Sequence, residues 1–378
     1  MAQVSVVKVE NGDVASAVRK SIDLLGGMER FVQKDDLVLV KPNLFVHQSE
    51  ASGLVTSPRV IEATTLLAKT LGAQVIIGER TPNVCKNLAE TKLEDIAEII
   101  SFDDAPRRDI RIEGAKGLFF DVPMPQIVDD CDVFINIPGL RTHALTLMSN
   151  AMKNLMGLLP RDYTRLVHLC GLDESIVDLN MYRPSHLVVT DAIICAQGNF
   201  PGPAKPLPLN LIIAGDNPVA VDAVAAGIVG YNPEQIEHLV DANRRGLGPI
   251  DLAEIELRGC DVEPFYDSFE KAHTTIVEYN DRVKIVAPAI CDSCRQALGC
   301  GLKQAEELGW LDRKAELMVV SGPVEAWPEF SSTADVVLYG NCASRWRHNG
   351  VFERGCPPLG GQVVKALREL GYPKIEKK

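Results

Sequence analysis

The chain has 378 residues, which is long for one globular domain and sufficient for two. Its net charge of -12, with no block of basic residues, argues against sequence-independent binding to nucleic acid, which requires a basic surface. No uncharged apolar stretch approaches the roughly 20 residues of a membrane span, and no signal peptide is visible. The missing apolar span predicts no insertion into a membrane. Ten cysteines without a secretory signal predict a reducing compartment, by default the cytoplasm.

Short apolar runs alternate with segments of helical periodicity through the first 280 residues. The runs expected to form strands are Val4–Val7, Leu37–Val40, Val75–Gly78, Val133–Ile137, Leu187–Thr190 and Leu211–Gly215. The expected helices are Val14–Leu25, Val60–Leu71, Leu88–Ile100, Leu147–Leu158 and Asn217–Val229. This alternation predicts an α/β fold with a doubly wound, mostly parallel sheet over residues 1–280.

A smaller, flavodoxin-like α/β domain is expected over residues 284–378. Val283–Ala287 and Val336–Tyr339 are typical of buried strands, and Gln362–Leu370 is typical of a helix. The boundary is expected at residues 280–284. The motif-bearing region of the first domain ends well before this point, and a new unit of strand, thiol pair and helix begins after it.

Polar side chains follow the predicted strands of the first domain. An open parallel sheet binds its ligand outside the carboxyl ends of its strands, so these side chains predict a site for an anionic ligand with phosphate or carboxylate groups. The expected ligand-binding residues are Lys41, Asn43, Arg141, His143, Lys153, Asp191 and Asp216. His143 and Lys153 are also candidate catalytic groups, for proton transfer or metal binding. A surface lysine, a structural histidine and an internal salt bridge of Lys153 with Asp191 or Asp216 are the alternatives.

Four cysteines are expected to meet at one edge of the second domain. Cys291 and Cys294 form a Cys-x-x-Cys after one predicted strand, Cys342 follows the other strand, and Cys356 opens the last helix. Zinc sites usually pair two Cys-x-x-Cys turns, whereas these wider spacings favour a [4Fe–4S] cluster, and unligated thiols remain an alternative. Cys300 is expected to lie outside the ligand set, because the helix after the pair carries it away from the edge.

Two sequence resemblances sharpen these expectations. The ordered motifs Cys291-x-x-Cys294, Gly340-Asn-Cys342 and Gly355-Cys356-Pro-Pro resemble the proximal-cluster motifs of nickel–iron hydrogenase and complex I small subunits. That resemblance implies a [4Fe–4S] cluster on the four cysteines.

The N-terminal motifs resemble the DUF362 family over roughly residues 35 to 250. They are Val-Lys41-Pro-Asn43, Ile-Pro138-x-x-x-Thr-His143, Lys153-Asn-x-x-Gly157 and Asp216-x-x-x-Ala-Val-Asp222. Arg141 stands where family members commonly carry lysine, and the ferredoxin-like cysteine repeats of many relatives are missing. The Pro-x-x-x-x-His and Lys-x-x-x-Gly pattern also resembles lactate racemase, a family that uses a nickel-pincer nucleotide.

These features predict a cytoplasmic iron–sulfur oxidoreductase suited to anaerobic conditions. Its cluster would exchange electrons with the anionic-ligand site and with a donor or acceptor protein. No Gly-x-Gly-x-x-Gly motif follows the early strands, so the usual fingerprint of NAD binding is absent. A non-enzymatic protein for electron transfer or cofactor delivery is the alternative, and a metal-cofactor enzyme like lactate racemase is a further one.

Overall fold

The computed structural model describes residues 1–44, 49–80, 93–200, 204–273, 276, 279–312 and 315–372. Its contacts divide the chain into two compact units. The first, here called the N-terminal unit, comprises Met1–Thr142, Met148–Gln197 and Lys205–Glu270. The second, here called the thiol unit, comprises His143–Leu147, Gly198–Ala204 and Lys271–Lys378. The domain boundary near residue 280 remains a prediction, and the contacts group two earlier segments and residues from Lys271 onward with the thiol unit.

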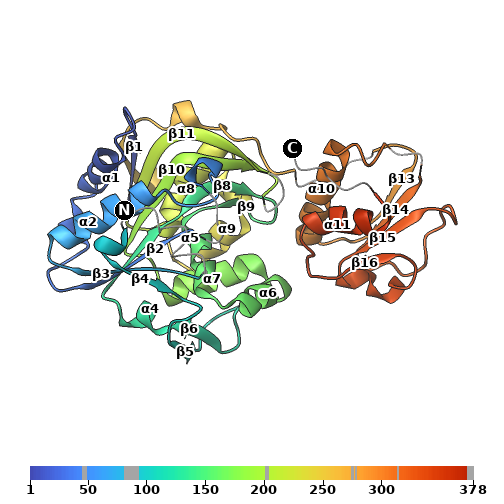
Figure 1. Ribbon diagram of the computed structural model, residues 1–378, viewed down its shortest axis with the longest axis horizontal. Helices are drawn as coiled ribbons and strands as arrows, with labels where there is room; N and C mark the ends of the chain where they lie inside the picture. Colours follow the sequence, from blue (N-terminus) through green and yellow to red (C-terminus); the bar gives the residue numbers. More distant parts are fainter. Residues whose placement is uncertain are drawn as a thin grey trace. The chain divides into compact units, whose positions relative to one another are not determined.

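A ten-stranded sheet forms the centre of the N-terminal unit, with the order β12-β1-β11-β10-β7-β2-β3-β4, β8 beside β10 and β9 beside β8 (Figure 1). Its strands are β1 (Ala2–Lys8), β2 (Leu37–Pro42), β3 (Gln74–Glu79), β4 (Glu98–Ser101), β7 (Val133–Ile137), β8 (Gly139–His143), β9 (Leu147–Ser149), β10 (Leu187–Gly198), β11 (Ala204–Gly215) and β12 (Ile255–Gly259). A separate pair joins β5 (Arg107–Ile110) and β6 (Val122–Pro125). The pairings of β2 with β3 and β7, and of β3 with β4, are parallel, whereas β1 and β11 are antiparallel. The expected α/β, mostly parallel sheet is confirmed.

Helices cover both faces of this sheet because successive strand residues point to opposite sides. Val38 and Val40 of β2 belong to one apolar cluster with residues of the first two helices, and Leu39 belongs to a second cluster on the other face. Ile135 and Phe134 of β7 divide in the same way. The helices are α1 (Val14–Asp23), α2 (Pro58–Thr70), α4 (Gln126–Asp130), α5 (Ala151–Asn154), α6 (Arg161–Cys170), α7 (Leu172–Tyr182), α8 (Pro218–Val229) and α9 (Glu237–Arg244).

Two predicted helices differ from the structure. Residues 88–92 lie outside the described residues, and the end of the same predicted helix is strand β4, whose isoleucines lie beside β3. Leu147–Leu158 begins as β9 and continues through the short helix α5 into a 3-10 turn at Leu155–Leu158. The helical spacing of apolar residues is correct only for the second half of that segment.

The thiol unit has its own four-stranded parallel sheet (Figure 1). Its strands are β13 (Val283–Val286), β14 (Leu317–Ser321), β15 (Asp335–Tyr339) and β16 (Val351–Glu353), and its helices are α10 (Asp292–Glu307) and α11 (Gly361–Glu369). The strands lie in chain order, so the reversal of order that marks a flavodoxin-like sheet does not occur among them. Strand β14 was not expected from the sequence.

The two faces of the smaller sheet are covered differently. Met318, Val320 and Leu338 face a cluster that includes Trp327 and Trp346, which come from loops. The alternate residues are also buried, on the face that α10 and α11 cover. Among the described residues, no helix combines the length and apolar character needed to cross a bilayer.

Candidate functional sites

Four of the expected anionic-ligand residues lie around the ends of β2 and β7: Lys41, Asn43, Arg141 and Lys153. Strand β2 connects to its neighbour β3 on one side, and the chain later returns to place β7 on its other side. The sheet therefore has a topological switch point between β2 and β7, where α/β proteins hold ligands. Lys41 and Asn136 are register partners at this point.

Lys41 is fully buried and paired with Glu79, which ends the neighbouring strand β3. Its Nζ lies 2.7 Å from Glu79 Oε2 and also donates to the carbonyl oxygen of Pro42 at 3.1 Å. Burial lowers the pKa of Lys41 and the carboxylate of Glu79 raises it. The prediction was that Lys41 projects at the rim to meet an anion; in the structure an internal carboxylate takes that place.

The Lys153-Asn154-x-x-Gly157 motif packs on this ion pair. Asn154 Oδ1 lies 3.4 Å from Lys41 Nζ, and Asn154 Nδ2 donates to Asn136 Oδ1 at 2.7 Å. A Cβ atom at Gly157 would lie 2.6 Å from both Lys41 Nζ and Glu79 Oε1, which is too close for any side chain. In this motif, Asn154 supplies a side-chain amide to the Lys41–Glu79 salt bridge, and Gly157 leaves the space that the salt bridge occupies.

Arg141 and Asn43 share the same region. Arg141 donates to the carbonyl oxygen of Leu54 at 3.0 Å and lies 3.4 Å from Asn43 Oδ1, while Asn43 Nδ2 also donates to Leu54. Burial lowers the pKa of Arg141 to about 10, and the charge of Glu79 opposes this shift. The guanidinium is held in one orientation beside the switch point.

Lys153 is half-buried on α5. Burial lowers the pKa of its amine to about 7, the nearby charge of Arg141 lowers it further, and Asp173 raises it. Arg141 and Lys153 therefore feel each other's charge, and an anion held between them would be attracted by both.

His143 belongs to the thiol unit. Its Nδ1 accepts hydrogen bonds from the backbone of Leu145 at 3.1 Å and of Thr146 at 3.3 Å, and its ring packs against Phe200 with centroids 5.8 Å apart. These bonds make Nε2 the protonated nitrogen of the neutral ring. Its contacts are those of an oriented, buried histidine.

The two predicted aspartates have other partners. Asp191 accepts from the backbone N–H groups of Ser57 at 2.7 Å and Ile193 at 3.0 Å, so it stabilises the start of α2. Burial raises its pKa to about 6, and those two backbone bonds oppose the shift. These two hydrogen bonds are with backbone groups, whereas the alternative was a salt bridge with Lys153.

Asp216 lies at the opposite edge of the sheet from the predicted one. It accepts from Gln3 N at 2.9 Å and from Arg30 at 2.6 Å. Only residues 199–203 separate β10 from its neighbour β11, which is too short for a parallel crossover. Strand β11 therefore runs against β10 and β7, and its carboxyl end is remote from Lys41. The expectation that Asp216 follows a parallel strand was wrong.

The four predicted cluster cysteines are held by the strand ends of the thiol unit. Cys342 and Cys356 lie in two loops joined by a hydrogen bond from Asn341 N to the carbonyl oxygen of Gly355, at 2.9 Å. A Cβ atom at Gly340 would lie 3.5 Å from Cys294 Sγ, so the first thiol pair meets the same loops. Burial and the nearby thiols Cys291, Cys356 and Cys342 raise the pKa of Cys294.

Cys300 lies elsewhere in the thiol unit. Its thiol donates to the carbonyl oxygen of Asn199 at 3.4 Å and packs with Ala144 and Ala272. Burial raises its pKa to about 12, with Glu307 as the second cause. These surroundings are those of a packed, structural thiol.

A zinc ion and a [4Fe–4S] cluster place different demands on four thiolates. Within the described part of the chain, no three His, Cys, Asp or Glu side chains are arranged to hold one ion. A zinc ion would need its sulfur ligands about 2.3 Å from a common point. A [4Fe–4S] cluster distributes its four thiolates over four irons.

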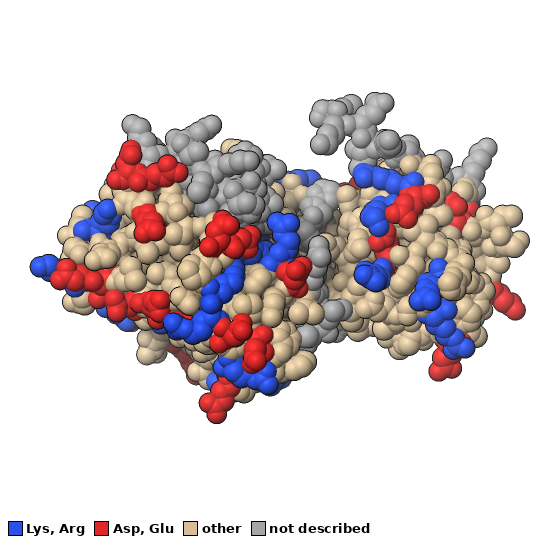
Figure 2. Space-filling view, turned by 60° about the horizontal axis from the view of Figure 1, so that its bottom comes forward, with Lys and Arg blue, Asp and Glu red and all other residues tan. Residues whose placement is uncertain are grey.

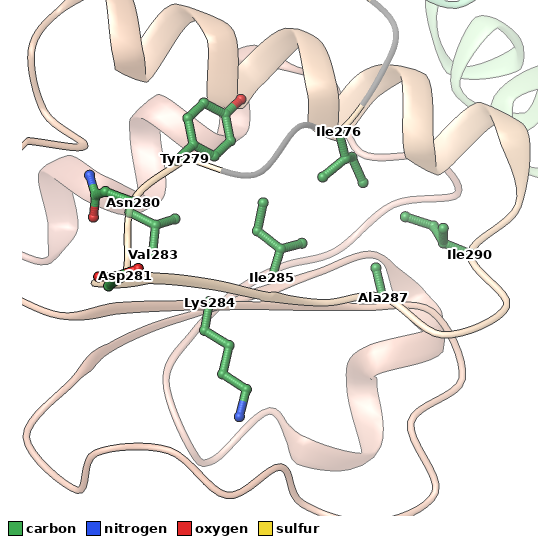
Figure 3. A pocket seen from close by; sticks show the side chains of 9 residues that line it. All are labelled: Ile276, Tyr279, Asn280, Asp281, Val283, Lys284, Ile285, Ala287 and Ile290. Atoms are coloured by element: carbon green, nitrogen blue, oxygen red, sulfur yellow. The ribbon is translucent and has the colours of Figure 1, made fainter.

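A hollow of about 570 Å³ lies beside β13, and its lining makes it a poor anion site. Ile276, Ile285 and Ile290 point into the space between β13 and α10, with Tyr279 above them (Figure 3). Lys284 is the cation of the lining, and it points to the other side of the strand (Figure 3). Aliphatic side chains thus share the lining with Asn280 and with the carboxylate of Asp281, which would repel an anion.

Several residues around the switch point were not predicted as part of it. Glu79 and Asn154 interact with Lys41, Asp173 interacts with Lys153, and Asn136 accepts a hydrogen bond from Asn154. From the sequence, Glu79 is expected just past the end of a predicted strand, as Lys41 is, but it is not included in the expected ligand set; a buried lysine requires such a partner. Asp173 gives no such signal, since only the packing of α7 brings it toward Lys153.

The family match lies in the N-terminal part of the chain. Residues 38–227 match the family described as "Domain of unknown function (DUF362)". The thylakoid-associated protein sll1697 of Synechocystis is 27% identical over 248 residues, which are 64% of this chain and 77% of that protein. The lactate racemase apoprotein of Thermoanaerobacterium thermosaccharolyticum is a structural neighbour with a TM-score of 0.38 and 10% identity, over 85% of this chain and 69% of that one.

Proposed function

This chain belongs to the DUF362 family, and we propose that it is an iron–sulfur redox protein with a small-anion site in its N-terminal unit. Cys291, Cys294, Cys342 and Cys356 would hold a [4Fe–4S] cluster. Such a cluster, when bound, supplies one-electron transfer at a potential set by charge, hydrogen bonds and burial. The proposal includes a cytoplasmic location.

The observation that carries the proposal is the convergence of the four thiols. The ends of three separate strands, β13, β15 and β16, precede them, and Gly340 lies beside Cys294, since a Cβ atom at Gly340 would be 3.5 Å from Cys294 Sγ. The loops of Cys342 and Cys356 are joined twice, by the Asn341–Gly355 backbone bond and by Gly355 N donating to Asn341 Oδ1 at 3.0 Å. Cysteines that served only for packing would not need exposed positions, yet Cys291 and Cys342 are exposed.

The second part of the proposal is that Arg141 and Lys153 bind a small anionic substrate or cofactor. Asn43 orients Arg141, and Asn154, which follows Lys153 in the chain, lies 3.4 Å from the Lys41 amine of the Lys41–Glu79 pair. A bound anion would favour the charged form of Lys153, whose pKa of about 7 lies near neutrality. Lys153 could also move a proton once the anion is bound, which is the catalytic role that we propose for it.

Purification without oxygen tests the cluster. The intact protein should contain about four irons and four sulfides per chain and give the electron paramagnetic resonance signal of a reduced cubane. Serine at Cys291, Cys294, Cys342 or Cys356 should remove the cluster or leave a three-iron species. Cys300→Ser and Cys260→Ser are the controls and should keep all iron. Full iron in any of the four variants would refute that ligand assignment.

Native mass spectrometry of the same preparation tests the anion site. A small anion retained by the wild type and lost in Lys153→Met supports an enzyme or an anion-dependent carrier. A reducible cluster in a protein that binds no anion would instead favour the non-enzymatic alternative, electron transfer or cofactor delivery.

A further inference from the structure

The chain between two proposed cluster ligands carries a group of exposed arginines. Arg345, Arg347 and Arg354 all lie between Cys342 and Cys356, and all three are exposed. The acid of this segment, Glu353, is buried and bound to Lys365 at 2.6 Å. Within the described residues, none of the three arginines forms an ion pair with a carboxylate.

The contacts of these arginines leave their charges available. Arg345 lies 3.3 Å from the carbonyl oxygen of Glu325, and Arg347 lies 3.4 Å from His348 Nε2. Both partners are uncharged acceptors in the neutral state of the histidine, so neither cancels a positive charge. The protein as a whole has a net charge of -12, whereas this segment between Cys342 and Cys356 is positively charged. Figure 2 shows grouped Lys and Arg side chains on the surface of both units.

A half-buried tryptophan lies among the arginines. Trp346 is covered by Arg345, whose guanidinium carbon is 5.2 Å from the indole ring, and it packs on Trp327 with ring centroids 5.5 Å apart. Its Nε1 donates to the carbonyl oxygen of Val324 at 2.9 Å, which fixes the ring. Rigid tryptophan and arginine side chains are the residue types enriched at the energetic centre of protein interfaces.

This surface lies next to a proposed cluster ligand. The 3-10 helix Asn341–Trp346 has Cys342 near its start and Trp346 at its end. With a rise of about 2 Å per residue, the four steps between them span about 8 Å along the helix. A protein bound on Trp346 would therefore be close to Cys342.

We propose that Arg345, Trp346, Arg347 and Arg354, here called the arginine face, dock an acidic one-electron carrier protein of the iron–sulfur type. This inference rests on the proposed cluster. One electron passes from the reduced carrier to the oxidised cluster, or in the reverse direction. No bond forms or breaks, and no proton is required. The interface is expected to be small and transient, as redox encounters are, with charge complementarity mainly raising the association rate.

A protein partner fits the charge pattern better than a nucleic acid or a membrane does. Glu325 and Glu329 are exposed on the loop that carries Trp327. A uniformly negative phosphate surface would be repelled by both carboxylates, whereas a folded carrier can place its acids opposite the arginines alone.

The test uses the full-length protein, purified without oxygen, and a reduced plant-type [2Fe–2S] ferredoxin as the probe. The variant is R345Q/R347Q/R354Q. The control, R19Q/R282Q/R368Q, removes the same charge from exposed positions outside the face. Stopped-flow absorbance gives the rate of cluster reduction by ferredoxin and by dithionite, and titration at low salt gives the affinity for ferredoxin. Iron content checks that the cluster is intact.

The face variant should react with ferredoxin about tenfold more slowly than the wild type at low salt, and its rate should depend less on ionic strength. Its reduction by dithionite and its iron content should be unchanged, and the control should behave as the wild type does. Equal ferredoxin rates in the face variant and wild type would overturn the inference. So would an equal loss in the control, or tighter wild-type binding to duplex DNA or phosphatidylserine vesicles than to ferredoxin.

The two proposals fail in different ways. A wild type that carries no reducible cluster in the dithionite arm refutes the proposed cluster. Ferredoxin binding that is weakened only in the face variant would still support the docking surface. Absence of ferredoxin binding to a wild type with an intact cluster refutes the docking surface alone.

Discussion

The switch-point site and the thiol site hold chemically demanding groups in contrasting ways. At the switch point, side chains satisfy one another: Lys41 meets Glu79, and Asn154 bonds to both Lys41 and Asn136. At the thiol site, backbone bonds between loops hold the sulfur atoms, and the thiols raise the pKa of Cys294. The first site is stabilised by its own charges, whereas the second is stabilised by any bound group that brings positive charge to its thiolates.

The largest expected effect is on the switch-point side of this comparison. Glu79→Gln leaves Lys41 buried without its carboxylate and should destabilise the N-terminal unit by about 3–5 kcal/mol. Urea denaturation followed by circular dichroism measures this loss. Lys41→Met combined with Glu79→Gln is the control and should recover much of the stability. If Glu79→Gln alone costs under about 1 kcal/mol, the ion pair does not support the site.

A smaller loss is expected from filling the space above the same ion pair. Gly157→Ala places a methyl group 2.6 Å from Lys41 Nζ and should cost about 1–3 kcal/mol, because both partners must shift. Gly361→Ala, at the start of α11 where the new methyl meets no atom within 4 Å, is the matched control. It should leave stability unchanged or raise it slightly. Equal stabilities for the two variants would contradict this packing.

The next effect separates ligand binding from stability. Sulfate remains a dianion from pH 6 to 9, so any change in its affinity over this range reflects a change in the protonation of the protein. Since the pKa of Lys153 is about 7 in the free protein, its amine is charged below that pH and loses its proton above it. Affinity should therefore fall about tenfold between pH 6.5 and 8.5, as measured by calorimetry.

Two substitutions check the origin of that pH dependence. Lys153→Met should bind sulfate weakly at every pH, and Lys153→Arg should bind it with little dependence on pH. A wild-type affinity that does not change across neutrality would show that Lys153 does not contact the anion.

The smallest expected effect concerns Cys300. Cys300→Ser replaces a thiol that donates to Asn199 by a hydroxyl in an apolar cluster, so it should cost about 1 kcal/mol of stability at most. Iron content should not change. Thermal unfolding and iron analysis of the same sample measure both. Lost iron together with unchanged stability would place Cys300 among the ligands.

Much of the fold was predictable because apolar runs determine where strands lie. Leu37–Val40 and Val133–Ile137 are strands as expected, and their alternate residues divide between the two layers. Strand β14 carries the same signal in the sequence, an apolar run followed by Gly322-Pro323. The direction of a strand was harder to predict. Strand β11 runs antiparallel to β10 because their connection is short, and Asp216 therefore lies at the other edge of the sheet.

The candidate sites were predictable to different degrees. The spacing of Cys291, Cys294, Cys342 and Cys356 was enough to expect their convergence, because each follows a strand or precedes a helix. For Lys41, the sequence indicated a position at the switch point but not whether its partner would be a ligand or a side chain. Only the packed structure shows that Glu79 supplies the carboxylate.

The grouping of residues in the thiol unit has a consequence for how this protein could have arisen. Residues His143–Leu147 and Gly198–Ala204 belong to that unit although they lie far upstream of Lys271. The chain therefore passes between the two units five times. A gene fusion that appended residues 271–378 to an ancestor would have transferred only part of the compact body. An engineer who transplants the cysteine motifs into another scaffold must carry, or replace, the two upstream segments as well.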